Sequence, residues 1–155
     1  KHDPNVAKLT AKYHAACCLM HNRTEPVYEN FLEDLLSDLQ ECVQIARDAG
    51  VPDDRILLDP GIGFGKTYEM NLEAINRLEL LHRLGFPLLL GTSRKSVIGL
   101  TLQLPADQRL EGTIATSVIA VMKGCAFVRV HDVRENRRAV RMTEAILGRS
   151  IDEER

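Results

Sequence analysis

The sequence contains no tryptophan, and only 5% of its 155 residues are aromatic. Proteins that bind single-stranded nucleic acid without base preference stack the bases on aromatic side chains, so this composition argues against that class. The formal net charge of −2 leaves no surplus of basic residues for a phosphate backbone. We therefore expect no nucleic-acid partner.

Paired cysteines and long apolar runs are also lacking. No Cys-x-x-Cys spacing occurs, which argues against a zinc site and a redox pair. We expect the four cysteines to be buried free thiols of a cytoplasmic protein, namely Cys17, Cys18, Cys42 and Cys125. No stretch approaches the ~18 apolar residues of a membrane span, and no signal-peptide pattern is present. The first residue is lysine rather than methionine, which suggests a segment of a longer protein.

Hydrophobic residues make up 45% of the chain, enough for the core of one domain. Short apolar runs that predict strands alternate with helical patterns over 27–49, 68–84, 110–123 and 133–147, and a short helix is expected near Ser96. The expected apolar stripes contain Phe31, Leu35, Leu39, Val43 and Ala46, then Leu72, Ile75, Leu78 and Leu81, then Ile114, Val118 and Val121, and finally Val140, Thr143 and Leu147.

This alternation predicts an α/β fold with a parallel sheet and right-handed crossovers. A complete TIM (β/α)8 barrel needs roughly 200–250 residues, so the chain is expected to be the second half of one, about four βα units. Residues 5–13 are interpreted as the end of a preceding helix. The predicted domain spans residues 1–148, and residues 149–155 form a charged tail.

Residues 59–66 read Asp-Pro-Gly-Ile-Gly-Phe-Gly-Lys and follow the apolar run 56–58. The spacing of the glycines does not match a Walker A loop, and Lys66 stands where the dinucleotide fingerprint needs a small residue. A glycine-rich turn lets backbone approach a ligand closely, and Asp59 lies where the strand is expected to end. The motif favours a flat ligand that needs a carboxylate partner and an aromatic wall.

Polar residues also follow the other predicted strands, at their carboxyl ends. Residues 87–90 lead into Gly-Thr-Ser-Arg-Lys-Ser at 91–96, residues 15–20 lead into His-Asn-Arg at 21–23, and residues 127–132 read Phe-Val-Arg-Val-His-Asp. Arg129 and His131 are two apart and are expected to share a face of a strand. Ligands of parallel α/β proteins bind outside the carboxyl ends of the strands, so these groups are expected to form one site.

Together, the motifs at 59–66, 93–96 and 129–132 closely resemble dihydropteroate synthase, from about Ala15 to Gly148. The resemblance implies a TIM barrel of folate biosynthesis. Such a transferase joins 4-aminobenzoate to hydroxymethyl-dihydropterin diphosphate and releases diphosphate. The resemblance also implies a homodimer, a requirement for Mg²⁺ and sensitivity to sulfonamides.

The resemblance assigns catalytic roles to Asp59, Lys95 and Arg129. Asp59 is expected to accept hydrogen bonds from the amino and ring N–H groups of the pterin, and Lys95 to donate to its carbonyl and ring nitrogen. Arg129 is expected to lie flat on the pterin. His131 would help to hold the diphosphate.

Further substrate contacts are implied by the same resemblance. Met20 would pack on the pterin, and Ser93 and Phe64 would flank the aminobenzoate, with Ser93 near its carboxylate. Gly63 and Gly91 would leave room for the planar ligand. The resemblance assigns no metal ligand in this chain, because the loops that bind diphosphate and aminobenzoate in the family follow its first two strands. The isolated chain is therefore expected to be inactive or weakly active.

Structural interpretations remain open for several of these residues. Asp59 could cap a turn, Arg129 could form a salt bridge with Asp59 or Asp132, and His131 could be a hydrogen-bonded structural histidine. Residues 21–23 could be an ordinary loop. Lys66 is interpreted as a turn residue rather than a ligand. His2, His14 and His82 are assigned no function.

Two other functions remain alternatives at this point. A methyltetrahydrofolate-binding domain that passes a methyl group to a corrinoid protein would share the contact of Asp59 with a pterin. A non-catalytic half-barrel is the other alternative. In that case the chain would associate with another copy or with a separate first half.

Overall fold

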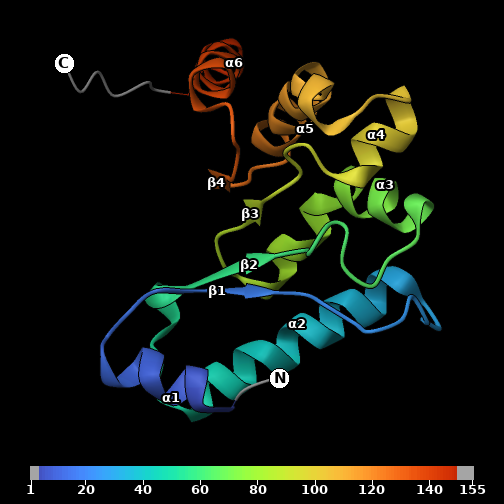
Figure 1. Cartoon of the computed structure of the whole chain (residues 1–155). Coiled ribbons are helices and arrows are strands. Elements are labelled where there is room, and N and C mark those ends of the chain that lie inside the picture. The colour runs from blue at the N-terminus through green and yellow to red at the C-terminus, as the bar shows by residue number, and fades with distance from the viewer. Residues whose placement is uncertain (1–3, 150–155) are drawn as a thin grey trace.

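The computed structural model describes residues 4–149, so His2 and most of the predicted charged tail lie outside the described residues. Strands and helices alternate along the chain (Figure 1). The strands are β1 (Cys17–Met20), β2 (Ile56–Asp59), β3 (Leu89–Leu90) and β4 (Phe127–Val128). The α-helices are α1 (Pro4–Lys12), α2 (Phe31–Asp48), α3 (Tyr68–Asn76), α4 (Ser96–Leu102), α5 (Leu110–Met122) and α6 (Val133–Ile146). Three 3₁₀ segments, Asp53–Arg55, Leu78–Leu84 and Ala106–Gln108, complete the described elements.

All the described strand pairs are parallel, as the alternation predicts. β1 pairs with β2 so that Met20 lies opposite Asp59, and β3 pairs with β4. A parallel bridge between Leu58 and Leu88 joins the two pairs, and the amide of Leu58 donates to the carbonyl of Pro87 at 2.9 Å. The strands therefore lie in the order in which they occur in the sequence, and their carboxyl ends meet at one edge.

The strands are shorter than the sequence predicts. Pro87 has no amide hydrogen, and β3 begins only at Leu89. The expected strand over 127–132 is wrong beyond Val128, although the amide of Arg129 still donates to the carbonyl of Leu90 at 2.9 Å. Arg129 and His131 therefore lie on a strand-end loop rather than on a strand.

α2 packs against the strands as the periodicity predicts. Asn30 caps its first turn by accepting a hydrogen bond from the amide of Glu33, and the helix begins at Phe31 rather than Val27 because of this cap. All five residues of the predicted stripe are buried. They cover the strand residues Ile56, Leu58, Leu88 and Leu90, which form the centre of the core.

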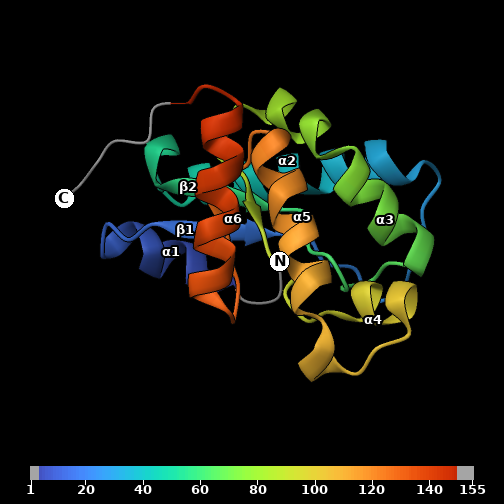
Figure 2. The ribbon, with the colours of Figure 1, turned by 90° about the horizontal axis from the view of Figure 1, so that it is seen from above.

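Three other helical predictions need correction. The helix predicted over 68–84 breaks at Arg77 into α3 and a 3₁₀ segment, and Leu72 of its stripe is 41% exposed. In α5 the buried face is Thr113, Ser117, Ala120 and Val121, so the predicted stripe through Ile114 and Val118 is displaced by one residue. In α6 Thr143 is buried, whereas Leu147 is exposed. α5 buries small and polar side chains because it packs closely against α6, where Ser117 donates to the buried amide oxygen of Asn136 at 2.8 Å (Figure 2).

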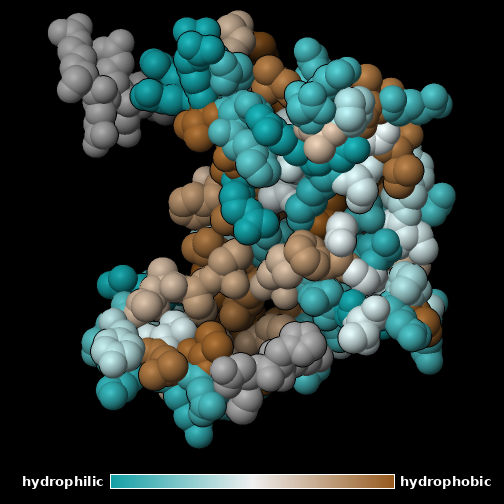
Figure 3. Space-filling view, in the orientation of Figure 1, coloured by the Kyte–Doolittle hydropathy of each residue, from teal (hydrophilic) through white to brown (hydrophobic). Residues whose placement is uncertain are grey.

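The side of the molecule away from α3 and α4 is hollowed, and apolar residues line much of the hollow (Figure 3). A small pocket of about 170 Å³ follows β1 and is lined in part by Cys17, Cys18 and Met20. The four cysteines are free thiols, as expected, but they are not fully buried, and Cys18 is exposed. Cys18 alternates along β1 with Cys17 and Leu19, which pack against the core, so its side chain points to the opposite face of the strand.

Within residues 4–149, none of the helices has the length and apolarity that crossing a bilayer requires.

Candidate active site

A pocket of about 360 Å³ lies at the carboxyl ends of β3 and β4. Its lining comes from the two loops that follow these strands, and contains Gly91, Ser93, Lys95, Arg129, Val130 and His131. Five of these six residues were predicted as site residues from the sequence. The predicted residues therefore do converge, and Asp59 at the end of β2 lies beside the same space.

Asp59 is only 2% exposed, and its Oδ1 atom accepts a hydrogen bond of 2.7 Å from the amide of Gly61. Burial raises the pKa of this carboxyl group, while the Gly61 amide and the nearby charges of Lys95, Arg129 and Lys66 oppose that rise. Asp59 does cap its turn, as the structural interpretation holds. An ionised carboxylate has a second oxygen, Oδ2, which can accept further hydrogen bonds.

Lys95 reaches from the loop after β3 to the turn after β2. Its ammonium group donates to the carbonyl of Ile62 and lies 4.7 Å from the centre of the Phe64 ring. Phe64 is 37% exposed and therefore presents a ring face that Lys95 does not cover completely. Burial lowers the pKa of Lys95, Asp59 opposes this change, and Arg129 adds to it. Lys95 thus lines the pocket, contacts the Phe64 ring and lies close enough to Asp59 to interact with its charge.

Arg129 lies against the backbone of the neighbouring loop. A Cβ atom built on Gly91 would lie 2.9 Å from a terminal nitrogen of the guanidinium group, so a larger residue at Gly91 would displace it. Arg129 itself is exposed and lines the pocket. The alternative of a salt bridge from Arg129 to Asp59 or Asp132 is not found among residues 4–149, where Asp132 pairs with Arg94.

Ser93 and His131 are joined across the pocket. The Ser93 Oγ atom lies 2.9 Å from His131 Nδ1 and accepts a hydrogen bond of 3.2 Å from the amide of His131. Ser93 is buried, whereas the His131 ring is exposed. This arrangement places the hydroxyl group where it orients the imidazole.

Two arginines fix the loop that carries Lys95. Arg94 has a φ of 58° and points away from the pocket, and its guanidinium group binds Asp132 at 2.7 and 3.2 Å. Arg109 donates to the carbonyl of Arg94 at 2.8 Å and to that of Lys95 at 3.3 Å. The backbone on both sides of Lys95 is therefore held, and Lys95 rather than Arg94 faces the pocket.

The remaining predicted site residues surround the turn after β2. Gly63 has a φ of 83°, and its amide donates to the buried side chain of Asn71 at 2.6 Å. Met20 is half-buried opposite Asp59 at the end of β1. Asn71 was not predicted. The sequence offers only one sign of its role, namely that a polar residue lies beside the apolar positions of α3.

Sequence reasoning also missed a buried polar cluster behind the turn. His21 is 1% exposed and contacts both Asp38 of α2 and Lys66. The interpretation of residues 21–23 as an ordinary loop is wrong for His21. Lys66 directly follows the turn at residues 61–65, and its interpretation as a turn residue rather than a ligand stays a prediction. His21 follows β1 directly, and its position at a strand end was the available signal.

Among residues 4–149, no group of three or more His, Cys, Asp or Glu side chains is arranged to hold a metal ion.

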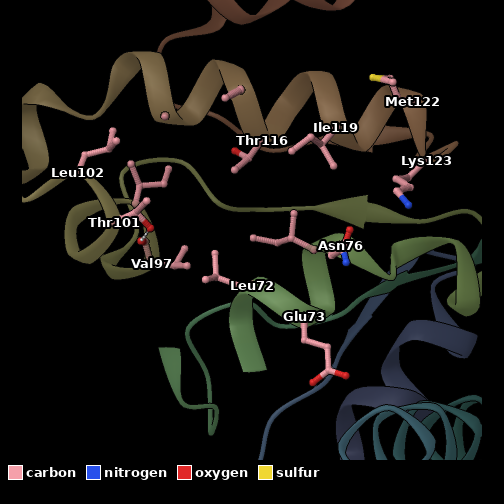
Figure 4. Close-up of a pocket in the computed structure, with 14 residues that line it drawn as sticks. Leu72, Glu73, Asn76, Val97, Thr101, Leu102, Thr116, Ile119, Met122 and Lys123 are labelled. Carbon is pink, nitrogen blue, oxygen red and sulfur yellow. Dashed lines mark hydrogen bonds between the residues drawn. The ribbon is translucent and has the colours of Figure 1, made fainter. Parts of the chain in front are cut away.

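A larger pocket of about 700 Å³ lies away from these groups, between α3, α4 and α5 (Figure 4). Leu72, Thr101 and Ile119 are among the residues that line it. Its lining surface is mostly apolar, although Glu73, Asn76 and Lys123 also border it, and it contains none of the charged groups at the strand ends. We therefore place the candidate active site in the smaller pocket, where the cations and the carboxylate converge.

The fold and the site define an α/β protein whose candidate binding groups lie at the carboxyl ends of parallel strands. Comparison with known proteins agrees with this class. The family model described as pterin binding enzyme matches residues 1–131. The chain belongs to the family of pterin binding enzymes.

The resemblance to dihydropteroate synthase is confirmed by individual relatives. The chain is 62% identical to dihydropteroate synthase of Clostridium beijerinckii over 96% of its own length and 56% of that protein. It matches a crystal structure of the Clostridium difficile enzyme with pteroic acid with a TM-score of 0.92 and 47% identity, over 94% of this chain and 56% of that one. A Yersinia pestis dihydropteroate synthase in complex with a sulfonamide drug gives a TM-score of 0.90 and 36% identity over the same shares. The chain spans about half the length of the curated relatives that it matches.

Proposed function

We propose that the chain forms the pterin-binding half of a dihydropteroate synthase of folate biosynthesis. This transferase would join 4-aminobenzoate to hydroxymethyl-dihydropterin diphosphate. The observation that carries the proposal is the convergence of Asp59, Lys95 and Arg129 on one space in a chain of the pterin binding enzyme family. In the proposed reaction, the bond between the methylene carbon and the diphosphate oxygen breaks. A bond from the amine nitrogen to that carbon forms, and the amine loses a proton.

Asp59 would receive the donor edge of the pterin. Its Oδ1 atom is held by Gly61, so the carboxylate presents a fixed acceptor to an amino group and a ring N–H. As diphosphate leaves, positive charge develops on the pterin-methyl group. A buried carboxylate stabilises this charge more strongly than a solvated one would, because little water screens it.

Lys95 and Arg129 would complete the pterin site. Lys95 lines the pocket, and its ammonium group, which donates to the carbonyl of Ile62, would also donate to the carbonyl side of the pterin. Arg129 borders Gly91 with a planar group that can lie on the pterin face. His131, held by Ser93, would contact the diphosphate, and Phe64 would border the aminobenzoate.

We further propose that the chain supplies four units of a TIM (β/α)8 barrel. β1 and β4 would be its open edges, and a first half would cover them. Mg²⁺ would enter with the diphosphate, since magnesium is commonly bound through substrate phosphates, and we assign no reaction step to it. Localisation in the cytoplasm remains a prediction, supported by the four free thiols.

Binding of pteroate by calorimetry tests the pterin site. Asp59→Asn should weaken binding at least about tenfold, because the amide places a donor against the donors of the pterin. Asp54→Asn, at an exposed carboxylate away from the site, is the matched control and should bind like the unmodified chain. Equal affinity of the Asp59 variant and the control would refute the assignment.

An assay of diphosphate release tests whether the chain needs a preceding half-barrel for activity. The chain alone should release little or none. A chimera that places the preceding part of the Clostridium beijerinckii enzyme before residues 1–155 should be active and sensitive to sulfonamides. Full activity of the chain alone would contradict the half-barrel proposal.

A second copy of the chain is the partner that we propose for the apolar pocket between α3, α4 and α5. Leu72, Leu102 and Met122 are exposed large apolar residues on its lining. Burying such side chains removes apolar surface from water and favours association. Leu72→Glu with Met122→Glu should shift the chimera toward monomer in sedimentation. An unchanged sedimentation profile would exclude this surface.

A further inference from the structure

A buried polar cluster joins three segments behind the turn at residues 61–65. Lys66 lies at its centre. The Lys66 Nζ atom is 2.8 Å from His21 Nδ1, and it donates to the carbonyls of Gly61 and Phe64, each at 3.0 Å. An ammonium group carries three hydrogens, and three acceptors surround this one.

The other side of His21 fixes the direction of these hydrogen bonds. His21 Nε2 lies 3.0 Å from Asp38 Oδ2, which also accepts a bond of 2.6 Å from Arg23. An ionised carboxylate can only accept, so Nε2 carries the proton and Nδ1 is left as an acceptor for Lys66. Burial and the charge of Lys66 lower the pKa of His21 to about 4, with Asp38 opposing them. The ring is therefore neutral at pH 7.

The turn lies directly on the segment after β1. Gly61 has a φ of 68°, and a Cβ atom there would collide with the carbonyl of His21. The amide of His21 donates to the carbonyl of Asp59 at 2.9 Å, and the Tyr28 hydroxyl donates to the carbonyl of Gly65 at 2.7 Å. The position of the turn is thus determined by its contacts with residues 21–28.

The same turn carries groups of the candidate site. The amide of Gly61 binds the Asp59 carboxylate, the carbonyl of Ile62 binds Lys95, and the Phe64 ring lies under that ammonium group. Movement of the turn would therefore displace the partners of both Asp59 and Lys95. We propose that Lys66 is a positioning residue: its ammonium group ties the turn to His21 and so sets the geometry of the pterin site. This inference rests on the proposed function.

The pKa of Lys66 shows how the closed turn affects its charged form. Burial lowers the pKa of Lys66 to about 8, Asp59 and Asp38 oppose that shift, and Lys95 and Arg23 add to it. If the turn opened, the pKa would return toward 10.5, so raising the pH from 8 to 10.5 favours the closed turn. Burial thus disfavours the charged form of Lys66. At pH 7, below this pKa, the side chain is still an ammonium group, and its three hydrogen bonds offset the cost of burying the charge.

The test compares Lys66→Met with Lys8→Met, which removes an exposed lysine of α1. Hydrogen exchange of the amides of Gly61, Gly63 and Phe64 should accelerate about tenfold or more in Lys66→Met. Exchange in the middle of α2 should not accelerate to the same extent. The ¹⁵N resonance of His21 Nδ1 should shift, because this atom loses its donor. Pteroate binding should weaken about tenfold.

Several outcomes would overturn the inference. Unchanged turn amides and an unchanged His21 resonance would show that Lys66 does not hold the turn. Equal acceleration in α2 would show a general loss of stability. Faster exchange of the turn with unchanged pteroate affinity would show that the turn does not set the pterin site. If the unmodified chain fails to bind pteroate, the proposed function fails, and the exchange and resonance measurements still decide whether Lys66 holds the turn.

Discussion

The hydroxyl oxygen of Ser93 lies 2.9 Å from Nδ1 of His131, a residue 38 positions further along the chain. The contact joins the loops after β3 and β4 across the candidate site. The sequence suggested that Ser93 would lie near the carboxylate of the aminobenzoate. In the structure the hydroxyl group is engaged with the imidazole and with the His131 amide, so we expect Ser93 to act through His131.

A double-mutant cycle tests this relationship. Ser93→Ala and His131→Ala should each weaken binding of the pterin diphosphate in calorimetry. The double variant should lose less than the sum of the two, by about 1 kcal/mol, because both changes remove the same interaction. Ser93→Ala combined with the distant His82→Ala should be additive. Additive losses for Ser93 and His131 would mean that the two residues act separately.

Lys95 and Arg94 are adjacent but should respond differently to removal. Lys95→Ala should weaken pteroate binding about tenfold or more, because it removes a partly buried cation from the site. Arg94→Ala removes a surface ion pair with Asp132, and such exposed pairs contribute little to stability. Its effect on pteroate affinity should be about twofold or less. Equal losses of affinity would contradict the orientation of Lys95 toward the ligand.

His21 makes stability depend on acid pH. Its pKa is about 4 in the folded protein against 6.5 ordinarily, so the unfolded chain binds more protons between these values. The free energy of unfolding therefore falls as the pH is lowered from 6.5 to 4, by up to about 3 kcal/mol from this residue.

The matched variant for this dependence is His21→Gln, which keeps an acceptor for Lys66 and a donor for Asp38 but does not titrate. Urea unfolding across this pH range should show a shallower loss of stability in His21→Gln than in the unmodified chain. His82→Gln, at the surface, serves as the control and should follow the unmodified chain. Parallel curves for all three proteins would argue against a buried neutral His21.

The four cysteines should react as free thiols once the chain is unfolded. In the folded chain, burial raises the pKa of Cys125 to about 11, and the charge of Asp59 adds to the rise. Only the thiolate reacts readily, so Cys125 should react slowly at pH 8, whereas the exposed Cys18 should be accessible to the reagent. A thiol assay in denaturant that detects fewer than four groups without prior reduction would indicate a disulfide.

Much of the fold could be predicted because local patterns specify it. The buried stripe of α2 and the apolar runs at 56–58 and 88–90 follow directly from helical and strand periodicity. The predictions failed where packing between helices decides burial. Leu72 has the right spacing for a core residue but lies on an exposed apolar pocket, and α5 buries Ser117 because Asn136 of α6 provides a partner.

The sequence by itself determined the strand-end motifs, and with them Asp59, Lys95, Arg129 and His131 as candidates for a pterin site. Parallel strands must bring their carboxyl ends to one edge, so residues at these ends meet whatever the details of the loops. Tertiary structure alone decided which partner each group takes. The pairing of Arg94 with Asp132 and the cluster of His21, Asp38 and Lys66 depend on contacts between distant segments, and no local periodicity encodes such contacts.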